Sequence, residues 1–216
     1  MSLDISGILG AVRREVTVRD HDGRPARVLV ATRVYPTSPD DLWDALTDPE
    51  RIPRWFLPVS GDFRVGGHFA FEGNASGDIT TCEPPTHLAV TWGMHGQVSW
   101  VDVTLAPEGA GTRLRLEHVA HVPEDMWDQF GPGAVGVGWE GALLGLDQYL
   151  GPGTPTVDPT TAAAWMATDE GKSFMRTASL LWRDAHVASG EDPSTATACA
   201  SRVAAFYTGE DSPGGS

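Results

Sequence analysis

The sequence predicts an α+β protein in which a curved antiparallel sheet wraps around one long helix, with two short helices early in the chain. Residues 14–35 alternate between apolar and polar side chains as a β-hairpin does, and residues 62–118 repeat this alternation between closely spaced turns. Short and regular turns favour antiparallel neighbours over β-α-β units. Residues 138–150 instead carry apolar side chains at helical spacing, and such a helix is needed to cover one face of the sheet.

The first predicted elements are a hairpin and a helix. Residues 14–19 and 27–35 have the pattern of its two strands, and Asp22-Gly23 between them is a strong signal for a tight turn. A helix is expected after Ser38, whose side chain can accept a hydrogen bond from a free N–H group of the first turn. The Pro-Asp-Asp that follows Ser38 suits the first turn and the positive end of the helix dipole.

Two later prolines predict that the second helix is short. Thr47-Asp48-Pro49 ends the first helix, and the next one runs through Trp55. Pro53 cannot lie deep inside a helix, because it has no N–H group and its ring clashes with the preceding turn. We therefore expect a short or kinked second helix between the second strand and the rest of the sheet.

The remaining strands are expected in residues 62–118. In the first of them, DFRVGGHFAFEG, Phe63 and Val65 and then Phe69 and Phe71 recur at the period of a strand. Four more segments with strand character follow, and they are separated by turn-forming residues. These segments are DITTC, HLAVTW, SWVDVTLA and TRLRLEHV.

We expect three regions along the chain. Residues 1–150 would form the sheet-and-helix domain, and a linker rich in Gly, Pro and Thr follows. The composition then changes to an Ala-rich helical extension, so that residues 151–208 form a second region. Residues 209–216, GEDSPGGS, would be a disordered tail.

Five stretches carry a resemblance to a known superfamily. They are RVYPTSPDDLWDALTDPERIPRWFLP, DFRVGGHFAF, GDITTCEPPTHLAVTW, SWVDVTLAPEGAGTRLRLEHV and GWEGALLGLDQYL. In order and spacing they resemble the SRPBCC (START/Bet v 1-like) superfamily, and within it the bacterial branch related to the C-terminal domain of the activator of Hsp90 ATPase. The resemblance covers about residues 14–150, and the Ala-rich extension departs from the minimal domain.

The resemblance implies a fold and several functions. The fold is a helix-grip, in which an antiparallel sheet curls round a long C-terminal helix and encloses a hydrophobic cavity. Members bind lipids, steroids or polyketides, a minority catalyse cyclisation, dehydration or hydrolysis, and some eukaryotic relatives stimulate Hsp90. One fold hosts many functions, so the resemblance identifies the fold more firmly than the activity.

Candidate ligand-binding residues are aromatic side chains and one histidine. Aromatic rings can line a pocket and stack on an apolar ligand, although ordinary core packing is the alternative for each of them. Trp92 shares a strand face with Val90, and His118 shares one with Leu116, so both should lie on the inner side of the sheet. The ligand-binding residues that we predict are Trp55, Phe71, Trp92, His118 and Trp139.

Several functional classes are disfavoured. A net charge of −14 would repel nucleic-acid phosphates, and no apolar run approaches the length of a membrane span. Cys82 and Cys199 are too few and too far apart for a disulfide scaffold or a zinc site. His118 and His121 also lack a metal-binding motif. We expect no metal and no cofactor, and a cytoplasmic protein without a signal peptide.

Three functions remain open. The first is binding of a small hydrophobic or amphipathic molecule in the cavity. The second is an enzyme of polyketide cyclase/dehydrase or hydrolase type on the same cavity, for which His118 is the candidate acid or base. The third is an interaction module, either Hsp90-activator-like with a chaperone partner or a homodimer formed through aromatic residues of the extension. We expect a binding protein rather than an enzyme.

Overall fold

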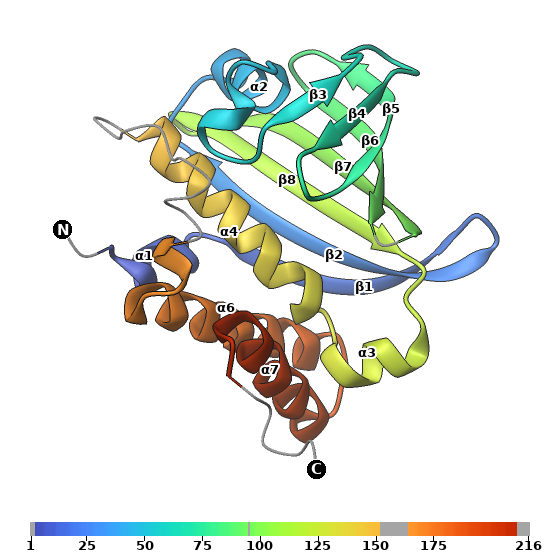
Figure 1. Cartoon of the computed structure of the whole chain (residues 1–216), viewed down its shortest axis with the longest axis vertical. Coiled ribbons are helices and arrows are strands. Elements are labelled where there is room, and N and C mark those ends of the chain that lie inside the picture. Colours follow the sequence, from blue (N-terminus) through green and yellow to red (C-terminus); the bar gives the residue numbers. More distant parts are fainter. Residues whose placement is uncertain (1–2, 95, 152–163, 211–216) are drawn as a thin grey trace. The chain divides into compact units, whose positions relative to one another are not determined.

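The chain forms two compact units that each combine segments distant in the sequence. The computed structural model describes residues 3–94, 96–151 and 164–210 (Figure 1). The first unit takes Met1–Ala31, His121–Gly141 and Thr160–Ser216, and the second takes Thr32–Ala120 and Ala142–Pro159. These boundaries differ from the one expected at residue 151, which stays a prediction. Most of the expected linker and tail, residues 152–161 and 211–216, lies outside the described residues.

The strands form one sheet of eight in the order β1-β2-β8-β7-β6-β5-β4-β3. The pairings from β3 to β8 are antiparallel. Together with a long helix, α4 (Gly133–Leu150), the sheet confirms the predicted α+β helix-grip fold. The strands are β1 (Arg13–His21), β2 (Arg24–Tyr35), β3 (Val59–Gly61), β4 (His68–Phe71), β5 (Ser76–Glu83), β6 (His87–Met94), β7 (Gln97–Glu108) and β8 (Gly111–Ala120).

The two early helices form as the sequence predicts. They are α2 (Pro39–Thr47) and the short 3-10 helix η1 (Ile52–Arg54). The N–H group of Asp41 donates to Ser38 Oγ at 3.3 Å, so the serine caps α2. Pro53 lies in the first turn of η1, where its missing N–H group costs nothing.

One predicted strand is shorter than expected. Phe63 and Val65 lie in a loop, where they are 39% and 56% exposed, and only His68–Phe71 pairs as β4. The reason is a tight turn at the glycine pair. Gly66 has φ +79°, and a side chain on Gly67 would lie 2.0 Å from the carbonyl oxygen of Asp62. The chain therefore reverses here instead of continuing the strand.

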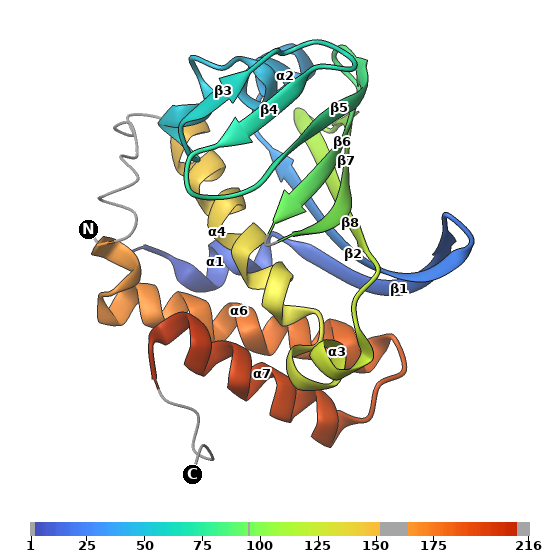
Figure 2. The ribbon, with the colours of Figure 1, turned by 45° about the vertical axis from the view of Figure 1, so that its right-hand side comes forward.

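In the second unit, the C-terminal part of α4 is attached to β2 and to the residue before η1. The Tyr35 hydroxyl donates to the carbonyl oxygen of Leu143 at 3.2 Å, and Arg33 forms an ion pair with Asp147. Arg51 Nε donates to the Tyr149 hydroxyl at 2.9 Å. α2 also contacts β7 and β8. Figure 2 shows β4 to β8 side by side, with α2 near β3.

In the first unit, the helical extension packs against the N-terminal segment. Its helices are α6 (Asp169–Ala188) and α7 (Pro193–Thr208), which contact each other, while α6 contacts β1 and α1 (Ile5–Gly10), and α7 contacts α3 (Glu124–Phe130). Phe174 and Trp182 are 0% and 1% exposed. They are therefore core residues of this unit and not an exposed surface for a partner. The side chains of Arg14 and Glu140 form a buried ion pair at 2.6 Å that joins β1 to α4.

Candidate functional site

One face of the sheet in the second unit is apolar from β4 to β8. Cross-strand partners in an antiparallel sheet point to the same side, so the register identifies the members of each face. We call this side the apolar face. Its paired residues on these strands are Phe69, Phe71, Gly77, Ile79, Cys82, Leu88, Val90, Trp92, Met94, Gln97, Ser99, Val101, Val103, Leu105, Pro107, Thr112, Leu114, Leu116 and His118.

The charged side chains of these strands lie on the opposite face, which also carries Trp100 and Val119. Asp78, His87, Asp102 and Glu117 lie on it, and His87 Nε2 is 2.8 Å from Asp102 Oδ2. Alternation of this kind is typical of an antiparallel sheet with one side packed and the other facing water. The apolar side chains that a ligand could contact therefore lie on the apolar face.

An aromatic cluster lies at one end of the apolar face. Phe71 on β4 contacts the ring of Trp92 on β6, with centroids 5.6 Å apart, and Phe69 contacts both. Phe56 meets Phe71 edge to face at 4.9 Å and 82°, and Trp55 lies 5.6 Å from Phe56. Phe69 is buried, whereas the other four rings are only half-buried. The cluster thus keeps aromatic surface that a bound molecule could cover.

Trp55 is held in the cluster by α2 and α4. Its indole Nε1–H donates to the carbonyl oxygen of Ala45 at 2.9 Å. On the other side, α4 approaches the backbone of Trp55 at Gly145, where a side-chain carbon would lie 2.3 Å from the Trp55 carbonyl oxygen. Only glycine allows this approach. The orientation of Trp55 is therefore fixed by two helices.

His118 lies on β8, the last strand of the apolar face, and is its last paired member on that strand. It is the β8 member of a row that continues through Val101, Val90 and Ile79, and it is 6% exposed. Burial lowers the pKa of His118 from 6.5 to about 4. The imidazole is therefore neutral at pH 7. Val90, in the same row, is two strands away, roughly 10 Å by strand spacing, and Trp92 lies two residues farther along β6.

The structure brings most of the predicted site residues together. Trp55, Phe71 and Trp92 join one cluster, and His118 lies on the same face of the sheet. Trp139 is half-buried on the part of α4 that belongs to the first unit, and its role stays a prediction. Gly145 is a residue that sequence reasoning misses. The only indication in the sequence is that a glycine lies inside a predicted helix, and such a glycine often marks a close contact with another segment.

His121 has a different environment from His118. Its Nδ1 lies 3.2 Å from the carbonyl oxygen of Pro25, and its ring lies 6.0 Å from that of His21. Among residues 3–94, 96–151 and 164–210, no group of three or more His, Cys, Asp or Glu side chains could hold a metal ion. In the part of the chain that the structure describes, no helix is both long enough and apolar enough to cross a membrane.

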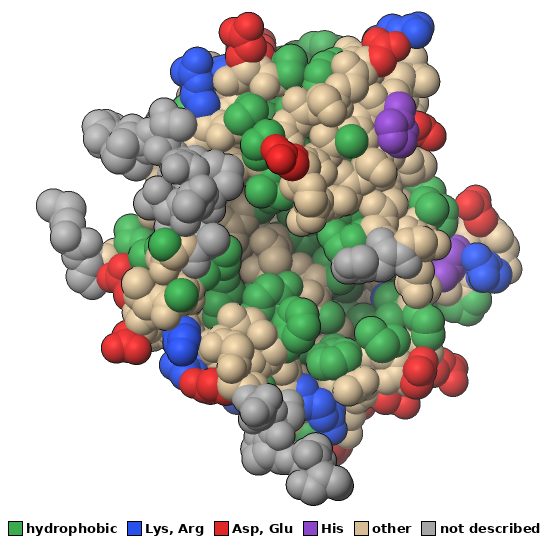
Figure 3. Space-filling view, viewed as in Figure 1, with side chains coloured by type: hydrophobic (Ala, Val, Ile, Leu, Met, Phe, Trp, Pro, Cys, Tyr) green, Lys and Arg blue, Asp and Glu red, His purple; other side chains and the backbone are tan. Residues whose placement is uncertain are grey.

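The basic side chains do not gather into a patch on the visible surface. On the face in Figure 3, Lys and Arg side chains are scattered among Asp and Glu side chains. Proteins that bind nucleic acids usually show clustered basic residues instead. This surface therefore gives no support to nucleic-acid binding.

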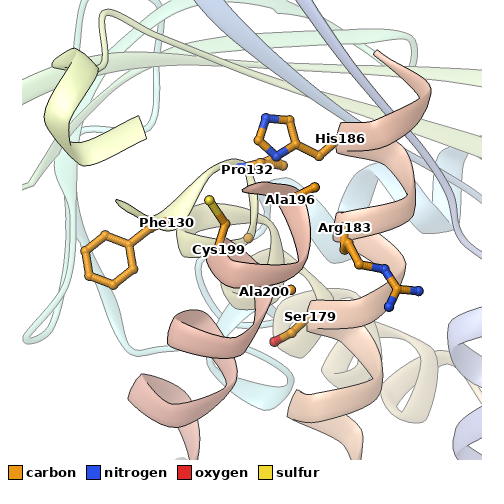
Figure 4. A pocket seen from close by; sticks show the side chains of 9 residues that line it. Phe130, Pro132, Ser179, Arg183, His186, Ala196, Cys199 and Ala200 are labelled. Carbon is orange, nitrogen blue, oxygen red and sulfur yellow. The ribbon is translucent and has the colours of Figure 1, made fainter. Parts of the chain in front are cut away.

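A small cavity lies among the helices of the first unit. Figure 4 shows His186 of α6 and Cys199 of α7 at its wall, and its volume is about 10 Å³. That volume is about one water molecule. His186 Nδ1 is buried with no hydrogen-bond partner among the described residues, and the Cys199 thiol donates to the carbonyl oxygen of Asp128 at 3.3 Å. This cavity is too small for the ligands considered above.

Comparisons with known proteins point to one family. Residues 36–151 match the family model described as Activator of Hsp90 ATPase homolog 1-like protein. The crystal structure of CalU16 from Micromonospora echinospora is 35% identical with a TM-score of 0.65, and the match covers 81% of this chain and 98% of CalU16. The solution NMR structure of CalU16 gives 35% identity, a TM-score of 0.69 and coverages of 83% and 97%.

Another protein of known structure matches part of the chain. Protein MLL2253 from Mesorhizobium loti is 30% identical with a TM-score of 0.50, and the match covers 57% of this chain and 96% of MLL2253. No curated protein matches the sequence significantly. The similarity to CalU16 covers more of the chain than the family model does, so it includes residues outside 36–151.

Proposed function

The chain belongs to the Activator of Hsp90 ATPase homolog 1-like protein family, and on that premise we propose that it binds a small hydrophobic or amphipathic molecule on the apolar face of its second unit. The observation that carries the proposal is the aromatic cluster. Trp55, Phe71 and Trp92 remain half-buried although their rings contact neighbouring aromatic residues. Convergent aromatic surface with one polar group nearby is typical of small-molecule sites.

An enzyme of polyketide cyclase/dehydrase or hydrolase type on the same face is the weaker alternative. A general acid or base works best when its pKa lies near the working pH. The pKa of His118 is lowered to about 4, so at pH 7 the neutral ring is a weak base and is not the imidazolium that general acid catalysis requires. These properties favour His118 as a hydrogen-bonding group for a ligand over a proton-transfer role.

A chaperone-linked function is supported by the description of the family alone. It predicts binding to an Hsp90 protein and a change in its ATPase rate. Both can be measured with the full chain, by calorimetry and by phosphate release. Binding of a small apolar probe without any effect on Hsp90 would separate the two functions in favour of ligand binding.

A pair of tryptophan variants tests the proposed site. Trp92 is on the apolar face, whereas Trp100 on the neighbouring strand is on the opposite face, and both are half-buried. We expect Trp92→Ala to weaken binding of a neutral aromatic probe by at least ~10-fold, because stacking and burial are lost. Trp100→Ala should leave binding unchanged. Fluorescence titration of both variants, after circular dichroism has shown that they fold, would measure this.

The same measurement can contradict the proposal. Absence of probe binding by the folded wild-type chain, or equal weakening in Trp92→Ala and Trp100→Ala, would rule out a site on the apolar face. Native mass spectrometry of gently purified protein supplies a second readout, because a retained ligand adds a defined mass.

A further inference from the structure

We propose that the ligand is an uncharged, flat aromatic molecule with at least one hydrogen-bonding group, and that the site rejects the corresponding carboxylate anion. This inference rests on the proposed function, since it assigns a ligand class to the same apolar face. Four features of the second unit carry it: the charge of the face, the state of two arginines near α4, the position of its histidine, and the aromatic cluster.

The paired residues of the apolar face include no Lys, Arg, Asp or Glu. From β4 to β8, every member that the register identifies is apolar or neutral except for the titratable groups of Cys82 and His118. Moving an ionised carboxylate from water to such a surface costs several kcal/mol unless a cation or several hydrogen bonds compensate. For a carboxylate ligand, the cost of removing the charge from water would therefore cancel much of the binding free energy that its ring contributes.

Two arginines of the second unit that contact α4, Arg33 and Arg51, are already paired. Arg33 forms an ion pair with Asp147, and its guanidinium lies 5.2 Å from the ring of Tyr35. Arg51 forms an ion pair with Asp41 at 3.0 Å. Redirecting either guanidinium to a ligand would leave an aspartate of the protein without its partner. The cost of this would offset the free energy gained by pairing with the ligand. Neither arginine is available to neutralise an anion at low cost.

His118 gives the apolar face a polar group without a charge. A neutral imidazole has one donor and one acceptor nitrogen. It can therefore serve a hydroxyl or a carbonyl group, whereas a carboxylate needs donors and is best served by a cation. The lowered pKa agrees with this, because the ring stays neutral at the pH of the cell.

The aromatic cluster selects for a flat ring system. Its rings meet at the angles of edge-to-face and tilted contacts, such as 82° between Phe56 and Phe71 and 44° between Phe71 and Trp92. A planar aromatic molecule can extend this arrangement by further offset or edge contacts. A flexible aliphatic chain would instead lose rotamer freedom on binding and gain no such contacts.

Three naphthalene compounds test the inference at pH 7, where naphthalene and 2-naphthol are neutral and 2-naphthoate is an anion. The ring system is the same in all three, so differences in affinity report the substituent. We expect 2-naphthol to bind ~3- to 10-fold more tightly than naphthalene, the worth of one net hydrogen bond. We expect 2-naphthoate to bind at least ~100-fold more weakly than 2-naphthol. Fluorescence titration with the full chain measures all three.

Two sets of variants assign the effects to residues. His118→Leu should remove the advantage of 2-naphthol over naphthalene, while His118→Gln, which keeps a hydrogen-bonding group, should retain part of it. Leu88→Arg places a cation on the apolar face, and we expect it to raise the affinity for 2-naphthoate by ~10-fold or more. Ala89→Arg is its matched control, because Ala89 lies on the opposite face. The Ala89→Arg variant should not change the preference for 2-naphthol over 2-naphthoate.

The outcomes separate this inference from the proposed function. Binding of naphthalene and 2-naphthol with equal or tighter binding of 2-naphthoate would overturn the inference and leave the proposed function intact. An equal gain in affinity for 2-naphthoate in Leu88→Arg and Ala89→Arg would also overturn the inference. Failure of the folded chain to bind any of the three compounds would overturn the proposed function and the inference with it.

Discussion

His118 combines deep burial with a titratable ring. Its folded-state pKa of about 4 lies below its ordinary value of 6.5, so between these values the unfolded chain binds more protons than the folded chain. Stability therefore falls as the pH drops from 6.5 towards 4, and below 4 the loss is complete. The loss from this group is about 3 kcal/mol by proton linkage.

A comparison of histidine variants tests this linkage. We expect the urea midpoint of the wild-type chain to fall more between pH 7 and pH 4.5 than that of His118→Gln. His68→Gln, which removes an exposed histidine that lies 2.8 Å from Asp78, should change the midpoints less than His118→Gln does, because surface pairs contribute little to stability. His186 adds to the same trend, because burial lowers its pKa as well. Equal midpoint shifts in His118→Gln and the wild type would show that His118 titrates normally in the folded chain.

At the scale of elements, α4 meets the segment after η1 through one glycine. A methyl group on Gly145 would lie 2.3 Å from the Trp55 carbonyl oxygen, whereas one on Gly141 of the same helix would touch nothing within 4 Å. We expect Gly145→Ala to destabilise the chain by ~1–3 kcal/mol and to weaken binding of an aromatic probe, because Trp55 must shift. Gly141→Ala should stabilise by ~0.5–1 kcal/mol.

Chemical unfolding and probe titration of the two glycine variants would check this expectation. Equal stability and equal probe affinity in both variants would mean that α4 can move away from Trp55 without cost.

The elements also show what the sequence could predict. Alternation in the strands placed Trp92 and His118 on one face, and the structure agrees, because side-chain direction in a strand depends on local geometry alone. The failure at Phe63 and Val65 has a local cause as well, the turn at Gly66. The contact of Gly145 with Trp55 joins residues far apart in the sequence. The spacing of apolar residues within one helix does not indicate which distant residues that helix will contact.

At the scale of the whole molecule, the extension belongs to a folded unit and not to a free appendage. The first unit joins residues 1–31 and 121–141 to the helices after residue 160, and it buries Phe174, Met175 and Trp182 almost completely. Loss of large buried side chains costs several kcal/mol each. The expected domain of residues 1–150 should therefore lose stability when the extension is removed, even if it keeps its sheet.

Shortened chains decide how far the extension supports the fold. We expect a chain ending at residue 151 to unfold at a lower temperature than the full chain and to bind a dye for exposed apolar surface, because β1 and α1 lose the cover of α6. A chain ending at residue 210 keeps α6 and α7, together with the ion pair of Arg176 and Glu210, and should match the full chain. An unchanged melting temperature in the chain ending at 151 would instead make residues 1–150 self-sufficient, with the extension attached to a domain that does not need it.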